Sequence, residues 1–212
     1  MRLVLDIFDE QRLLLDGSEK SFNNVRDYCD KTHIPILRPA TEQLVISLIK
    51  EKQPKTILEI GTAIGFSGAV MLLNSKAILN TIEIDERMAS VAKQNFLNCG
   101  IIDRATIFSG DCKEIIPKIT GQYDFIFLDG PKGQYLSLYP YLKDILNVSG
   151  MLVCDNVLYR GLTENPPSSY KHKHVTIANN LKEFLKTLKH DKQFNTEIYD
   201  FDDGISVSIK IC

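Results

Sequence analysis

From residue 56 onward the sequence alternates between short apolar runs and longer amphipathic segments, and this alternation restricts the chain to few folds. Short runs rich in isoleucine, leucine and phenylalanine predict buried strands, and the amphipathic segments predict helices. Strands that alternate with helices form a mainly parallel sheet with helices on both faces, an α/β fold. The expected elements are strand 56–60, a helix ending at 73, strand 79–84, helix 86–98, strand 105–109, helix 113–119, strand 123–128, helix 135–147 and strand 151–154.

The C-terminal part of the chain departs from this alternation. A helix is expected over 175–190, followed by strands over 196–199 and 205–211. The connection Asp200–Gly204 is too short for a crossover, so these last two strands should form an antiparallel hairpin. The sheet is therefore expected to have seven strands, mainly parallel, with an antiparallel C-terminal end.

The residues before the first strand carry apolar side chains at helical spacing. Two helices are expected within 1–34, separated by Gly17 and Ser18, and a third over 40–52. Pro35 and Pro39 should keep the residues between them extended. We interpret 1–52 as a helical appendage on a core of 53–212, and 1–212 as a single domain.

Composition excludes some classes of protein and leaves others open. Apolar runs are too short for a membrane span, and acids interrupt the first ten residues where a signal peptide needs an apolar core, so we expect a cytoplasmic protein. A net charge of −2 does not indicate a nucleic-acid binder, although a local basic patch can act within an acidic protein. The five cysteines lack zinc-finger spacing and are interpreted as reduced, structural thiols.

A glycine-rich turn follows the first strand. Gly61 and Gly65 lie in the segment 58–68, and glycines here let the backbone pass close to a ligand. Ala63 stands where a dinucleotide fingerprint needs its second glycine, so a pyrophosphate fits poorly. The acidic Glu59 suits the cationic amino acid part of S-adenosylmethionine (SAM) better than it suits an anionic pyrophosphate. The alternative is that the glycines only shape the turn; we favour SAM binding, with Glu59 and Gly61 as contacts.

Two further acids follow the second and third strands. Glu83 stands where an acid can accept both hydroxyls of a ribose. Enzymes that use NAD place an acid in the same way, so a NAD oxidoreductase remains a weaker alternative. Asp111 caps the next helix or reaches an adenine amino group, and the sequence leaves both interpretations open.

Oxygen donors follow two consecutive strands, with Asp129 after one and Asp155 and Asn156 after the other. The carboxyl ends of neighbouring parallel strands are where α/β sheets bind ligands. Carboxylate and amide oxygens suit Mg²⁺, and the absence of histidine or cysteine from the group disfavours zinc. The alternative is that each aspartate caps a helix.

Lys132 follows Asp129 by three residues. A divalent cation nearby would disfavour its ammonium form, so that Lys132 would act as a general base. The alternative is that Lys132 is a solvated loop lysine.

These motifs together resemble the metal-dependent O-methyltransferase family that includes catechol and caffeoyl-CoA O-methyltransferases. The resemblance rests on L-E-I-G-T-A-I-G-F-S, I-E-I-D, F-L-D-G-P-K and C-D-N-V and extends from Pro35 to the last strand. It implies a Rossmann-like SAM methyltransferase fold and a homodimer. It further implies that Lys132 is the base, that Asp129, Asp155 and Asn156 bind the metal, and that SAM contacts Leu37, Ser67, Glu83, Asp111, Cys112 and Asp129.

The stretch Asp155–Gly161 is more similar to the bacterial branch of that family, one member of which methylates 5-hydroxyuridine at the tRNA wobble position. The resemblance therefore implies Mg²⁺-dependent conversion of 5-hydroxyuridine to 5-methoxyuridine in a tRNA anticodon loop. The neighbouring oxygens of this base match those of a catechol, and an anticodon loop offers an unstacked base. Arg38, Tyr159 and Arg160 are the candidate substrate contacts. Tyr159 stands where a tryptophan is expected.

Two other functions stay open. The first is O-methylation of a small catechol or phenol, in which case residues 160–174 would form a mobile lid rather than an RNA contact. The second is a non-catalytic SAM-binding or RNA-binding module. The presence of Lys132 together with all the metal donors argues against a module that only binds.

Overall fold

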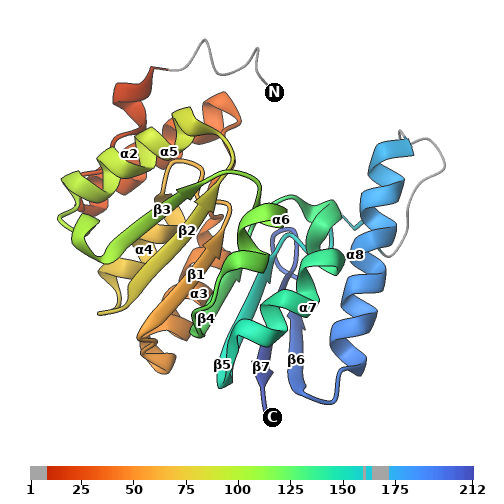
Figure 1. Cartoon of the computed structure of the whole chain (residues 1–212). Coiled ribbons are helices and arrows are strands. Elements are labelled where there is room, and N and C mark those ends of the chain that lie inside the picture. The colour runs from red at the N-terminus through yellow and green to blue at the C-terminus, as the bar shows by residue number, and fades with distance from the viewer. Residues whose placement is uncertain (1–8, 160, 164–171) are drawn as a thin grey trace.

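A seven-stranded sheet forms the centre of the computed structural model, which describes residues 9–159, 161–163 and 172–212 (Figure 1). The strand order is β3-β2-β1-β4-β5-β7-β6. The strands are β1 (Thr56–Ile60), β2 (Ile78–Glu83), β3 (Ala105–Ser109), β4 (Tyr123–Leu128), β5 (Leu146–Asp155), β6 (Phe194–Tyr199) and β7 (Ile205–Lys210). Strands β1 to β5 pair in parallel, and β7 pairs antiparallel with both β5 and β6, which confirms the predicted topology.

Helices cover both faces of this sheet (Figure 1). On one face lie α2 (Glu19–Thr32), α3 (Pro39–Lys52), α4 (Phe66–Leu73) and α5 (Glu86–Asn98), and on the other α6 (Cys112–Ile115), α7 (Tyr135–Ile145) and α8 (His172–His190). Short 3₁₀ turns are η1 (Glu10–Leu13), η2 (Ile102–Arg104), η3 (Ile116–Lys118) and η4 (Lys132–Gln134). In β4, Phe125 and Phe127 face the first set of helices, whereas Ile126 and Leu128 face the second. Burial on both faces explains why the strands are continuous apolar runs.

The prediction of a first helix is wrong for residues 9–17, the part of that segment that the structure describes. Between residues 9 and 17 there is one 3₁₀ turn, and Leu14 that follows it is extended. Leu13 and Leu15 are both buried, a spacing of two that fits extended chain. Asn95 of α5 holds this segment, because its side chain accepts a hydrogen bond from Leu15 N at 2.8 Å and donates to Leu13 O at 3.0 Å. In a helix these two backbone groups would bond within the helix, and the buried Asn95 side chain would lose both partners.

Replacing Asn95 by alanine should therefore destabilise the fold. Asn95 is fully buried and also donates to Ile64 O at 2.7 Å, so the change leaves three buried backbone groups without their partner. We expect a loss of about 2–4 kcal/mol in the free energy of unfolding, measured by urea denaturation. Asn98→Ala on the same helix is the control, because Asn98 is exposed and should change stability by less than about 0.5 kcal/mol. Equal stabilities of the two variants would contradict this assignment.

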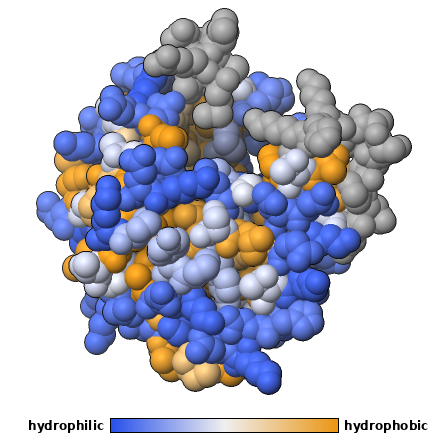
Figure 2. All heavy atoms as spheres, turned by 45° about the vertical axis from the view of Figure 1, so that its right-hand side comes forward, coloured by the Kyte–Doolittle hydropathy of each residue, from blue (hydrophilic) through white to orange (hydrophobic). Residues whose placement is uncertain are grey.

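The surface that carries α8 and the C-terminal hairpin is mainly hydrophilic. Figure 2 shows this side of the molecule, with hydrophobic side chains in separate patches between polar ones. No helix in the described ranges is both long and apolar enough to cross a membrane.

Candidate active site

Two adjoining cavities lie at the carboxyl ends of the parallel strands. The first, here the turn cavity, has a volume of about 510 Å³ and is lined by the glycine turn after β1 and by residues that follow β2, β3 and β4. The second, the carboxylate cavity, has a volume of about 640 Å³ and contains the residues that follow β4 and β5. Asp129 and Lys132 line both cavities, as does the segment 33–35. The two cavities therefore meet at Asp129 and Lys132.

Gly61 shapes the turn cavity through its backbone. Its φ is +100°, and a Cβ at this position would lie 2.5 Å from the carbonyl oxygen of Asp129. Only glycine allows the turn after β1 to pass this close to the end of β4. Beside it, Glu83 accepts hydrogen bonds from Ala63 N at 2.8 Å and Asp85 N at 2.9 Å. The backbone thus fixes the Glu83 carboxylate on the cavity wall.

Asp111 and Cys112 line the same cavity. Asp111 caps α6 by accepting a hydrogen bond from Lys113 N at 2.9 Å, so the capping interpretation is confirmed, while contact with adenine stays a prediction. The Cys112 thiol donates to Gln134 Oε1 at 3.4 Å. Burial raises the pKa of Cys112 to about 11, so this thiol stays protonated and acts as a donor.

Three of the expected SAM contacts, Glu59, Ser67 and Leu37, do not line the turn cavity. Glu59 is fully buried under the glycine turn, where its carboxyl accepts hydrogen bonds from the hydroxyls of Ser67 and Thr81. Glu59 and Ser67 line neither cavity. Leu37 lines the carboxylate cavity rather than the turn cavity. Residue spacing alone does not show that Glu59 and Ser67 face each other across the start of α4.

The buried position of Glu59 predicts how stability depends on pH. Burial, partly offset by the Ser67 and Thr81 hydrogen bonds, raises the pKa of Glu59 from 4.5 to about 7. The folded chain therefore keeps a proton that the unfolded chain loses, and this contribution to stability falls as pH rises from about 4.5 to 7. Glu59→Gln should flatten this dependence and raise stability at pH 8 by up to about 3 kcal/mol in urea denaturation. The exposed Glu51→Gln is the control, and an unchanged pH profile in Glu59→Gln would refute the assignment.

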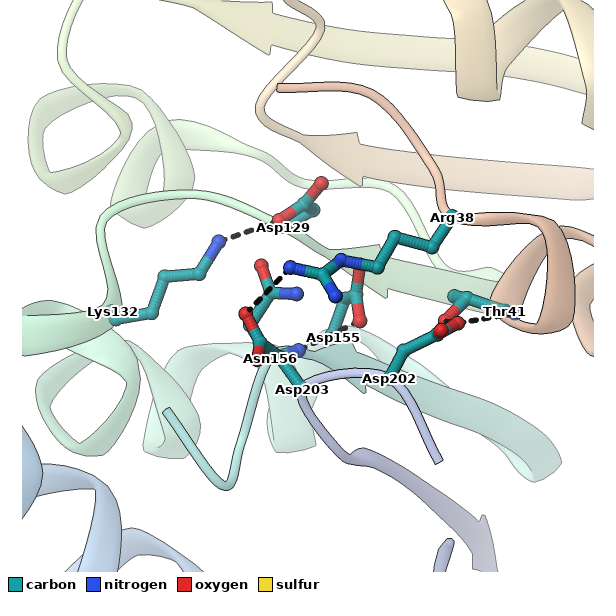
Figure 3. Close-up of polar contacts among 8 residues, drawn as sticks. All are labelled: Arg38, Thr41, Asp129, Lys132, Asp155, Asn156, Asp202 and Asp203. Carbon is teal, nitrogen blue, oxygen red and sulfur yellow. Dashed lines mark hydrogen bonds and ion pairs between the residues drawn. The ribbon is translucent and has the colours of Figure 1, made fainter. Parts of the chain in front are cut away.

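The carboxylate cavity brings together the oxygen donors expected from the sequence. Figure 3 shows Asp129 after β4, Asp155 at the end of β5 and Asn156 directly after it, all around one space. Lys132 Nζ donates to Asp129 Oδ1 at 2.6 Å. The two strand ends are tied by the Tyr135 hydroxyl, which lies 3.0 Å from Leu128 O and 3.1 Å from Asp155 O. A fixed distance between the strand ends also fixes the carboxylates that they carry.

Electrostatics at this cavity favours a bound cation. Asp155 is 5% exposed, and burial together with the charge of Asp129 raises its pKa to about 7. Among the described residues, no three His, Cys, Asp or Glu side chains form a metal-binding group, so a site here needs the amide oxygen of Asn156 as well. Two carboxylates and an amide are donors of the kind that a hard divalent cation prefers. The residues present therefore fit Mg²⁺.

The expected substrate contacts lie at the rim of this cavity. Arg38 precedes α3, and its half-exposed side chain pairs with Asp203 at 3.4 Å (Figure 3). Tyr159 lines the cavity, and its hydroxyl lies 2.8 Å from His174 Nδ1. Arg160 lies outside the described residues, as does most of the segment 160–174 that the sequence assigns to a lid or an RNA contact.

Sequence reasoning missed the acidic loop between β6 and β7. Asp202 accepts hydrogen bonds from Thr41 N at 3.1 Å and from the Thr41 hydroxyl at 3.0 Å, and with Asp203 it lines the carboxylate cavity. The three aspartates at 200, 202 and 203 were the available signal, but such residues are also typical of a hairpin turn.

Comparison with known proteins shows the family to which the chain belongs. A family model described as O-methyltransferase matches residues 19–211. The catechol O-methyltransferase of Sus scrofa is 34% identical over 128 residues, which cover 56% of this chain and 69% of that protein. The crystal structure of a candidate caffeoyl-CoA O-methyltransferase from Staphylococcus aureus is 27% identical with a TM-score of 0.84, and the match covers 99% of this chain and 98% of that one.

More distant structures share the fold alone. The O-methyltransferase TomG of Streptomyces achromogenes, solved in complex with SAM, has a TM-score of 0.81 at 17% identity, with 97% of this chain and 100% of that chain covered. The family match, by contrast, extends over nearly the whole chain and includes both cavities. This protein therefore belongs to the O-methyltransferase family and is a SAM-dependent O-methyltransferase.

Proposed function

We propose that the chain transfers the methyl group of SAM to a hydroxyl that has a second oxygen beside it on a planar acceptor. The observation that carries this proposal is the position of Asp129 and Lys132, which line both cavities. A methyl donor in the turn cavity and an acceptor in the carboxylate cavity would meet at these residues. Holding two reactants in contact supplies a large part of the rate in such a reaction.

In this proposal the turn cavity binds SAM, and the carboxylate cavity binds the metal and the acceptor. In the turn cavity, Glu83 would accept hydrogen bonds from the ribose hydroxyls of SAM, and Asp111 from the adenine amino group. In the carboxylate cavity, Asp129, Asp155 and Asn156 would hold Mg²⁺, and the cation would supply the Lewis-acid chemistry that lowers the pKa of an acceptor hydroxyl. A nearby cation would disfavour the ammonium form of Lys132, and the neutral Nζ would accept the hydroxyl proton. The oxygen would then attack the methyl carbon in line with the sulfur, and the methyl–sulfur bond would break to release S-adenosylhomocysteine.

For the acceptor we propose 5-hydroxyuridine at the wobble position of tRNA, which the reaction would convert to 5-methoxyuridine. Its C4 carbonyl and C5 hydroxyl provide the neighbouring oxygens. Tyr159 offers an aromatic surface for an unstacked base, and the half-exposed Arg38 at the rim could meet a phosphate. A homodimer and a cytoplasmic location remain predictions.

A small catechol is the second candidate acceptor. The 34% identity to a catechol O-methyltransferase favours it. The carboxylate cavity also carries five aspartates, at 30, 129, 155, 202 and 203, which suit a neutral phenol better than a polyanion.

One assay separates the two acceptors. Purified protein, Mg²⁺ and methyl-labelled SAM are incubated with tRNA from a strain that lacks this gene, or with a simple catechol. Label that maps to the wobble uridine and disappears with EDTA supports the tRNA proposal. Label in the catechol alone supports the small-molecule reaction, and label that resists EDTA contradicts the metal-dependent mechanism.

A further inference from the structure

Tyr159 and His174 form a pair beside the carboxylate cavity. The Tyr159 hydroxyl lies 2.8 Å from His174 Nδ1, the ring centroids are 6.0 Å apart and the ring planes are inclined by 26°, so the two rings meet nearly end to end through this hydrogen bond. Tyr159 lines the cavity, whereas His174 lies near the start of α8. We propose that His174 is a positioning residue that holds the Tyr159 ring as an aromatic wall for the planar ring of the methyl acceptor. This inference rests on the proposed function of the cavity.

The backbone of Tyr159 shows why its ring needs a partner. Its φ is +46°, in the left-handed region that aromatic residues rarely occupy. Such a conformation persists only where surrounding contacts hold it. Locally, Tyr159 N reaches Asn156 O at 3.3 Å, and Asn156 itself has a φ of +54°. The contact with His174 adds a hydrogen bond from a different element.

The same helix supports the loop that carries Lys132. Asn180 of α8 donates to the carbonyl oxygen of Gly133 at 3.2 Å. A Cβ on Gly133 would lie 3.6 Å from Ile177, so α8 packs directly on this loop. One helix therefore contacts both Tyr159 and the residue next to Lys132. This arrangement sets the position of the aromatic wall relative to the group that accepts the proton.

A planar acceptor gains from this arrangement in two ways. A ring stacked on Tyr159 buries apolar area, and its tilt is restricted while its two oxygens face Asp155 and Asn156. Without His174 the Tyr159 ring would have more orientations available, so acceptor binding would have to restrict it. The loss should therefore appear in acceptor affinity rather than in the chemical step.

Kinetics of His174→Ala test the proposal. The KM for the acceptor should rise about two- to tenfold, the range that one net hydrogen bond supplies, while kcat and the KM for SAM change less than about twofold. Tyr159→Phe should give a similar rise, and the double variant should add little, because both changes remove the same contact. His174→Asn should restore acceptor KM, since its side-chain amide can take the place of Nδ1.

The exposed His190 at the other end of α8 provides the control. His190→Ala should leave every kinetic constant unchanged. An unchanged acceptor KM in His174→Ala would overturn the positioning role. A fall in kcat and a rise in the KM for SAM as large as the rise in acceptor KM would overturn it as well.

A second measurement needs no acceptor. The chain has no tryptophan, so Tyr159→Trp introduces a single indole fluorophore at this position. An imidazole in contact with an indole quenches its emission, so adding His174→Ala to this variant should raise the emission, whereas adding His190→Ala should not. Equal emission with and without His174 would overturn the pairing. A rise in emission from a protein that methylates no acceptor would support the pairing and refute the proposed function instead.

Discussion

Lys132→Met should lower kcat by about 10²- to 10⁴-fold, the range that a positioned general base contributes. Lys132 Nζ lies where the two cavities meet and contacts Asp129 at 2.6 Å. Methionine keeps most of the side-chain volume and removes the group that takes the proton. The measurement is single-turnover methyl transfer from labelled SAM. Residual activity should increase with pH, because more of the acceptor hydroxyl then ionises without help.

Lys143→Met is the matched control for this prediction. Lys143 makes an ion pair of the same length, 2.6 Å, with Asp191, but lines neither cavity. Loss of an ion pair is therefore common to both variants, and only Lys132→Met removes a group from the site. Similar rates for the two variants would show that Lys132 is a structural lysine and not the base.

Much of the fold and of the site could be predicted because the strands are buried on both faces. Such strands read as apolar runs, and the polar residue that ends each run marks the edge of the sheet where ligands bind. Glu83, Asp129 and Asp155 were located in this way, and the structure places all three in the walls of the cavities. Neighbouring parallel strands then bring together residues that are far apart in the chain.

Residues whose surroundings depend on distant contacts could not be predicted. Leu13 and Leu15 are extended because Asn95, some 80 positions later, bonds to this segment. Arg38 pairs with Asp203, which lies in the loop between the two strands of the C-terminal hairpin. Glu59 sits in the glycine motif, but hydroxyls from two other elements hold it under the turn. In each case the sequence shows the group, and only the tertiary structure shows its partner.

Asp155→Ala should reduce methyl transfer by at least about 10³-fold, since it removes a carboxylate expected to bind the cation. Raising the Mg²⁺ concentration should not restore the rate. Asp203→Ala is the control: it removes a carboxylate from the same cavity, but one that pairs with Arg38, and it should keep metal-dependent activity. Equal loss in both variants, or a wild-type rate that is insensitive to EDTA, would contradict the metal assignment.

Stability separates this loss of activity from unfolding. Because the pKa of Asp155 is raised from 3.8 to about 7, its charged form opposes folding of the metal-free chain, and this opposition grows as pH rises from about 4 to 7. Without metal at pH 8, Asp155→Ala should therefore be more stable than the wild type, by up to about 4 kcal/mol. Mg²⁺ should raise the Tm of the wild type and leave that of the variant unchanged, because only the wild type binds it in the folded state. A variant that is inactive, more stable and unresponsive to Mg²⁺ has lost a ligand and kept its fold.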